Sequence, residues 1–190
     1  YIPGIAGRRF ETNNEKELAR TAFDQECSKL VRDLEANLIV LAGFDQILGR
    51  KLVDSNVFKV LNIHPAYDLL RFGGKNMVGR KVHEEVLKSG ATFSGCTVHF
   101  VTNDLDLGPV ILKKRTAISP RETPESLERK VLDLEHLAYP EAIQLVLDER
   151  VRVDSSGKAC YSDRYSKNWD VEWDHRQRKY VEMIEGKLPV

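Results

Sequence analysis

The sequence is poor in cysteine, in long apolar runs and in surplus charge. Its three cysteines, Cys27, Cys96 and Cys160, are odd in number and widely spaced, so neither a disulfide framework nor a zinc site is expected. Apolar runs such as Leu38–Leu41 are far too short to span a membrane. The 29 Lys and Arg equal the 29 Asp and Glu, which leaves no basic field for nucleic acid or an anionic membrane. We therefore expect a reducing, cytoplasmic setting.

Several motifs of metal and nucleotide enzymes are also missing. The chain has no HExxH, no paired CxxC and no Walker loop, which disfavours zinc hydrolysis and P-loop chemistry. The pair Gly73-Gly74 does not join a strand directly to a helix, so it is not interpreted as a phosphate loop. The sequence therefore predicts no metal site.

The composition is that of a folded domain, with 42% hydrophobic and 31% charged residues in 190. Apolar runs that end at turn residues alternate with segments whose apolar residues recur at helical steps. Strands are expected at 37–43, 57–64, 94–102 and 109–118, and helices at 14–34, 78–88 and 123–149, with a kink or restart at Pro140. In the first helix, apolar residues from Leu18 to Leu34 share one face. This alternation predicts an α/β fold: a Rossmann-like open, mainly parallel sheet with helices on both faces.

Two polar side chains stand at the end of a predicted strand, where open α/β sheets bind ligands. Asn62 and His64 are two residues apart, so both point to the same face. An amide can donate to a carbonyl oxygen, and an imidazole can carry a proton near neutral pH. From the spacing alone, a capping Asn and a satisfied loop His are an equally good interpretation.

The remaining candidates are weaker. Asp104 and Asp106 follow the next strand, where a carboxylate could orient an imidazole and raise its pKa, but Asp is common in turns for local reasons. His83 and His99 are expected to pack in the core. Glu135, beside a histidine on the long helix, more often bridges elements than binds a ligand.

Five short segments stand in a specific order along the chain. They are Leu41–Phe44, Leu61–Pro65, Thr97–Thr102, Leu105–Ile111 and Glu135–Pro140. Together they resemble the glycinamide ribonucleotide transformylases (phosphoribosylglycinamide formyltransferases) of purine biosynthesis. The resemblance implies the formyltransferase fold and transfer of a formyl group from 10-formyltetrahydrofolate, as co-substrate, to the amine of glycinamide ribonucleotide. Residues 1–153 would be the catalytic domain and 154–190 a C-terminal extension.

The resemblance also implies roles for particular residues. Asn62 would hold the formyl oxygen, His64 would protonate the folate leaving nitrogen, and Asp106 would tune this histidine and help to order a water. Amine attack on a formyl carbon creates an oxyanion, which Asn62 and a protonated His64 can stabilise. An Asp partner would raise the pKa of the histidine.

The implied binding residues surround these three. Arg20 would meet the folate glutamate carboxylate, backbone groups of two loops would contact the pterin, and Glu135 would contact the ribonucleotide. The folate set is Arg20, Asp45, Gln46, Ile47, Leu48, Asn62, Thr102, Asn103, Asp104, Leu105 and Asp106. The expected partners are these two small molecules, with no nucleic acid and no membrane.

The chain departs from the family pattern in three places. The loop Ala66–Phe72 lacks the family's second proline, and Leu132 stands where a polar substrate contact is common. No segment matches the family's opening strand and its glycine-rich loop for the ribonucleotide phosphate. We therefore expect the domain to be incomplete at its N-terminus, with two strand–helix units preceding Tyr1.

Three alternatives share parts of this pattern. A formyltetrahydrofolate hydrolase would use water as acceptor. A methionyl-tRNA formyltransferase is disfavoured by the balanced charge. A non-catalytic folate-binding fragment is suggested by the missing phosphate loop. The segment Glu135–Pro140 favours the ribonucleotide enzyme.

Overall fold

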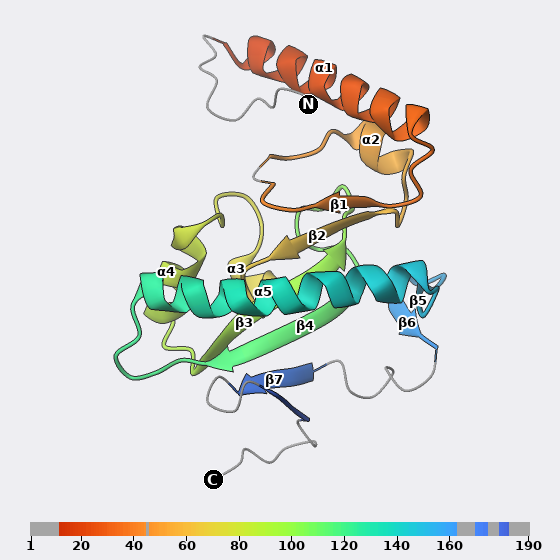
Figure 1. The fold of residues 1–190 in the computed structure, drawn as a ribbon. Coiled ribbons are helices and arrows are strands. Elements are labelled where there is room, and N and C mark those ends of the chain that lie inside the picture. The colour runs from red at the N-terminus through yellow and green to blue at the C-terminus, as the bar shows by residue number, and fades with distance from the viewer. Residues whose placement is uncertain (1–11, 45, 163–169, 175–178, 183–190) are drawn as a thin grey trace.

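The structure, a computed structural model, describes residues 12–44, 46–162, 170–174 and 179–182, which form an α/β fold (Figure 1). The helices are α1 (Asn13–Asp33), α2 (Arg50–Asp54), α3 (Leu69–Phe72), α4 (Arg80–Lys88) and α5 (Pro124–Leu147). The strands are β1 (Ile39–Leu41), β2 (Val60–His64), β3 (Phe93–Phe100), β4 (Val110–Ala117), β5 (Val151–Val153), β6 (Ala159–Tyr161), β7 (Asp170–Asp174) and β8 (Lys179–Glu182). The principal strands and helices therefore lie where hydrophobic periodicity predicts them.

The main sheet is mixed, and the expectation of a mainly parallel sheet is wrong. Its strand order is β1-β2-β3-β4-β7-β8. Only β1–β2 and β4–β7 pair in parallel, whereas β2–β3, β3–β4 and β7–β8 pair antiparallel. The turn at 101–109 is too short to return the chain to the start of β3, so β4 must run antiparallel to it.

The core lies between this sheet and the long helix α5, which crosses β2, β3 and β4 (Figure 1). Leu61, Val98, Leu127 and Leu134 are among its fully buried side chains. The helix begins at a Thr cap followed by Pro, and it continues through Pro140 without a restart. Pro140 is exposed, so water can satisfy the carbonyl that its missing N–H leaves free.

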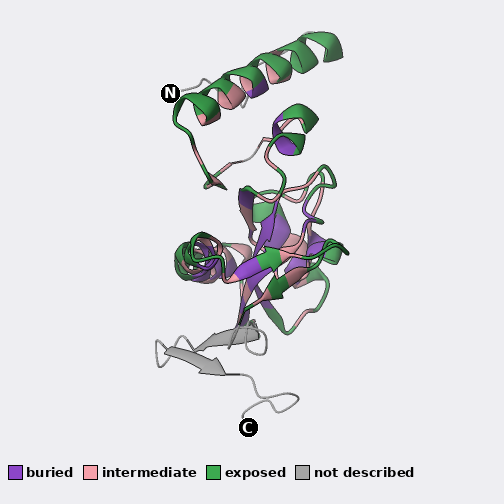
Figure 2. Ribbon diagram, turned by 90° about the vertical axis from the view of Figure 1, so that its right-hand side faces the viewer, coloured by how far each residue is buried: buried purple, intermediate pink, exposed green. Residues whose placement is uncertain are grey.

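Helix α1 lies beyond the β1 edge of the sheet and packs on α2, apart from α5 and the core (Figures 1 and 2). Thr12 and Glu15 form a capping box that fixes its start. The apolar face expected for this helix is not buried, since Leu18 is 61% and Leu34 68% exposed. Its one buried residue is Asp24. The periodicity therefore predicted the position of the helix along the chain correctly, but not the exposure of its apolar residues.

After α5, the described residues form strands. β5 and β6 make an antiparallel hairpin, and the Tyr161 hydroxyl donates to main-chain carbonyls of β4 at Val110 and Ile111. β7 and β8 extend the main sheet. The described part of 154–190 contains no helix, and residues 183–190 lie outside it. No helix in the described ranges has the length and apolar character needed to span a membrane.

Candidate active site

The site is built on the face of β2 that carries Asn62 and His64. Their two-residue spacing places both side chains on one side of the strand. The antiparallel neighbour β3 sets His99 directly opposite Asn62. As a result the Asn62 Nδ2 lies 3.4 Å from the His99 Nε2. Both histidines are almost completely buried.

A turn after β3 adds the carboxylate. Asp106 has a φ of +57°, a left-handed conformation that Asp and Asn adopt more readily than most residues. In this conformation its Oδ2 lies 3.6 Å from the His64 Nδ1, and its Oδ1 lies 3.5 Å from the His99 Nε2. The backbone N–H of Gly74 donates to the same carboxylate at 2.8 Å. Asn62, His64, His99 and Asp106 therefore form one connected cluster.

Burial decides the charge of this cluster. It lowers the pKa of His64 below the usual value and outweighs Asp106 and the Phe72 carbonyl, which both raise it. Asp106 therefore raises the pKa of His64 as expected, but burial is the larger effect and the net pKa lies below the usual value. For Asp106, burial alone would raise the pKa, but hydrogen bonds from His99 and Gly74 and the nearby imidazoles lower it. A neutral imidazole beside a carboxylate is the favoured state near neutral pH.

The cluster opens into a cleft of about 920 Å³. The residues named from the sequence that line it are Arg20, Gln46, Ile47, Leu48, Asn62, His64, Thr102, Asn103, Leu105, Asp106 and Glu135. Asp104 is exposed on the turn and does not line the cleft. Asp45 lies outside the described residues. Residues far apart in the chain thus meet around one space large enough for a small-molecule ligand.

Glu135 comes to the cleft from α5. Burial raises the pKa of its carboxyl to about 7. The side chain can therefore change charge near neutral pH, and a ligand that donates hydrogen bonds to it would favour the ionised form.

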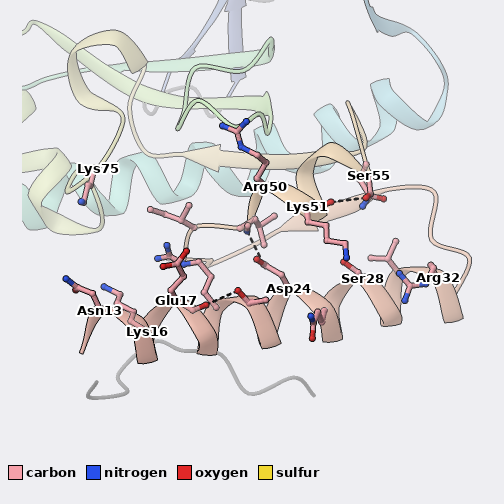
Figure 3. A pocket seen from close by; sticks show the side chains of 18 residues that line it. Asn13, Lys16, Glu17, Asp24, Ser28, Arg32, Arg50, Lys51, Ser55 and Lys75 are labelled. Atoms are coloured by element: carbon pink, nitrogen blue, oxygen red, sulfur yellow. Dashed lines mark hydrogen bonds between the residues drawn. The ribbon is translucent and has the colours of Figure 1, made fainter. Parts of the chain in front are cut away.

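A second cleft, of about 1100 Å³, runs along α1 and adjoins the first (Figure 3). Lys16, Arg20, Arg50 and Lys75 line both clefts. The Arg20 Nε is buried and has no hydrogen-bond partner among the described residues. Such a group is suited to an anionic ligand, because guanidinium binds carboxylate or phosphate through several hydrogen bonds.

Three contributors were not foreseen: His99, the Phe72 carbonyl and the Gly74 N–H. His99 was expected to pack in the core, as a histidine inside a strand usually does, and it is buried, but it also contributes to the site. Antiparallel pairing of the segments 57–64 and 94–102 would have placed it opposite Asn62. The two backbone groups have no sequence signal of their own.

Comparison with known proteins gives the class of this site. Residues 3–143 match the family described as Formyl transferase, and the chain belongs to that family. Among its relatives, the trifunctional purine biosynthetic protein adenosine-3 of Bos taurus is 38% identical over 142 residues, 75% of this chain and 14% of the relative. The chloroplastic phosphoribosylglycinamide formyltransferase of Arabidopsis thaliana is 36% identical over 132 residues, 70% of this chain and 45% of the relative. The chain thus spans less than half of either relative.

Solved structures agree on the fold. A phosphoribosylglycinamide formyltransferase from Anaplasma phagocytophilum superposes with a TM-score of 0.71 at 29% identity, covering 79% of this chain and 70% of that one. A formyltetrahydrofolate deformylase from Pseudomonas syringae gives 0.67 at 31% identity, covering 75% and 45%. The formyltransferase architecture is therefore shown, and it is shared by a protein named as a formyltransferase and one named as a deformylase.

Proposed function

We propose that this chain transfers a formyl group from 10-formyltetrahydrofolate to the amine of glycinamide ribonucleotide, as a phosphoribosylglycinamide formyltransferase. The observation that carries the proposal is the meeting of Asn62, His64 and Asp106 in one cleft. These are a donor for an oxyanion, a proton carrier and a carboxylate beside it. The names of the relatives support glycinamide ribonucleotide as the acceptor.

The reaction would proceed by addition and elimination. The amine nitrogen attacks the formyl carbon, and the carbonyl oxygen takes the electron pair as an oxyanion that the Asn62 Nδ2 stabilises. The carbon–nitrogen bond to the folate then breaks. His64, neutral at rest, takes up the proton that the amine loses and delivers it to the folate nitrogen, so the imidazole is neutral again at the end. The ionised Asp106 lowers the energy of the imidazolium whenever it forms.

The substrates would occupy different walls of the cleft. The loop at Gln46–Leu48 and the turn at Thr102–Asp106 would contact the folate, and Arg20 would pair with its glutamate carboxylate. Glu135, on α5, would accept hydrogen bonds from the ribonucleotide. In its deprotonated form this carboxylate is an acceptor only, which suits hydroxyl groups.

A second candidate is hydrolysis of formyltetrahydrofolate, in which water replaces the amine. The likeness to the Pseudomonas syringae deformylase favours it. It needs the same oxyanion donor and proton carrier, so the cluster around His64 does not separate the two reactions. Glu135 would separate them in its proposed role, because a residue that binds the ribonucleotide has no purpose when the acceptor is water.

The deciding experiment supplies 10-formyltetrahydrofolate to the purified chain with and without glycinamide ribonucleotide. We expect tetrahydrofolate to form only when the ribonucleotide is present, together with one equivalent of formylated ribonucleotide. Release of free formate without the ribonucleotide would instead establish the hydrolase. Folate binding without either product would identify a non-catalytic folate-binding protein.

A further inference from the structure

One short loop segment contacts both members of the His64–Asp106 pair. The Phe72 carbonyl accepts a hydrogen bond from the His64 Nε2 at 2.7 Å. Two residues later, the Gly74 N–H donates to the Asp106 Oδ2 at 2.8 Å. Since a carbonyl can only accept, the first contact requires the imidazole proton on Nε2. Since an N–H can only donate, the second favours the ionised carboxylate.

Gly73, between these two contacts, stands where no side chain fits. A Cβ built on it would lie 2.5 Å from the Leu69 carbonyl oxygen and 3.1 Å from the Asp106 Cβ. Its φ of −103° is ordinary, so the requirement is for space and not for a left-handed backbone. A side chain there would push the loop away from the pair that it contacts.

The segment is anchored on the N-terminal side of α3. The Asp68 carboxylate accepts from the N–H groups of Leu70 and Arg71 at 3.1 and 3.3 Å, which caps the helix. The buried Thr97 on β3 donates to the Ala66 carbonyl at 2.8 Å. Because α3 is a single short turn, these anchors set the direction of its last carbonyl, which is the one that meets His64.

We propose that the segment Phe72–Gly74 is a positioning element for formyl transfer, and that Gly73 is the residue that permits it. The segment holds the proton of neutral His64 on Nε2 and orients Asp106 toward Nδ1. It touches neither reacting atom itself. The kinetic consequence rests on the proposed function, whereas the location of the proton does not.

The proton location is read by nitrogen-15 correlation spectroscopy of the imidazoles, with the His64 signals assigned by their loss in His64→Gln. Above the usual histidine pKa of about 6.5, we expect His64 to carry its proton on Nε2. Gly73→Ala should give a mixture of the two tautomers. A proton on Nδ1 in the unaltered chain, or an identical spectrum for Gly73→Ala, would overturn the proposal even if the chain transfers no formyl group.

The kinetic test separates positioning from general damage. We expect Gly73→Ala to lower kcat about tenfold with the folate KM unchanged, the size of an ordinary coupling within one hydrogen-bond network. In a His64→Gln background the same change should have no further effect. Equal losses in both backgrounds, or a rise in KM with kcat retained, would show a merely structural role. Leu70→Ala is the matched control, because Leu70 on α3 is 86% exposed, and it should behave like the unaltered chain.

A second pair of variants applies should Gly73→Ala fail to fold. Asp68→Ala removes the cap of α3, whereas Asp68→Asn keeps a capping side chain. We expect the alanine variant to lower kcat and mix the His64 tautomers, and the asparagine variant to restore both. Identical behaviour of the two variants contradicts the proposal.

Discussion

The His64 Nδ1 lies 3.6 Å from the Asp106 Oδ2, and less than a tenth of either side chain is exposed. Burial keeps the histidine neutral in the resting site, while the carboxylate remains ionised. The negative charge of Asp106 therefore stabilises the imidazolium form of His64 when that form appears during turnover.

Asp106→Asn tests this relationship. Asn tolerates the same left-handed backbone, so the fold should persist, but the negative charge is lost. We expect kcat to fall by roughly 10²-fold, in line with typical acid–base contributions. Steady-state kinetics with both substrates measures the effect. A kcat within twofold of the unaltered chain would exclude a role for the charge.

His64→Ala should remove the proton donor without removing the folate site. We expect kcat to fall by about 10²-fold or more. Folate affinity, measured by fluorescence titration, should change little, because the loops at 46–48 and 102–106 are untouched. Turnover near normal would refute the assignment of His64 as the acid.

Arg20→Met should weaken binding and leave the chemical step intact. The buried Nε of Arg20 would lose its place at the folate carboxylate, so we expect the folate KM to rise about tenfold while kcat is unchanged. The control is Lys29→Met on the same helix, since Lys29 is exposed and pairs only locally with Asp33. A folate without its glutamate should bind Arg20→Met and the unaltered chain equally well.

Glu135→Gln should alter the pH dependence of stability. The folded-state pKa of about 7 lies above the unfolded value of 4.5, so Glu135 is most stabilising below 4.5 and this stability is lost as pH rises through 7. By linkage the loss is at most about 3 kcal/mol. Urea unfolding at pH 5 and 8 should show a smaller decline for Glu135→Gln than for the unaltered chain. Parallel declines would mean that the carboxyl is not desolvated.

The positions of strands and helices follow from local pattern, but their arrangement does not. The apolar run before Gly43 and the Thr cap at the start of α5 locate β1 and α5 correctly. Strand direction depends on loop length and pairing, which alternation alone does not report, so the mixed sheet was missed. The exposed leucines of α1 show the same limit, because periodicity defines a face and not what covers it.

The site shows a similar division. The spacing singled out Asn62 and His64, and the turn singled out Asp104 and Asp106, but only the family resemblance favoured a site over capping and turn residues. His99 was missed because its neighbour on the other strand depends on register. The effect of burial on the His64 pKa was not foreseen, because a sequence reveals a charged partner but not the amount of water that folding removes from around the imidazole.

The hydroxyl of Tyr139 lies 2.8 Å from the Leu41 carbonyl and 2.9 Å from the Leu61 carbonyl. A hydroxyl has one hydrogen, so it alternates between the two or is shared by them. Leu41 precedes the proposed folate loop, Leu61 precedes Asn62, and Glu135 stands one helical turn before Tyr139 on α5. The Tyr139 hydroxyl oxygen thus connects the strand before the proposed folate loop, the strand that carries Asn62 and the helix that carries Glu135. A shift of this hydroxyl would move all three of these elements together. Binding of folate on one side of the cleft could in this way alter the affinity for the ribonucleotide on the other.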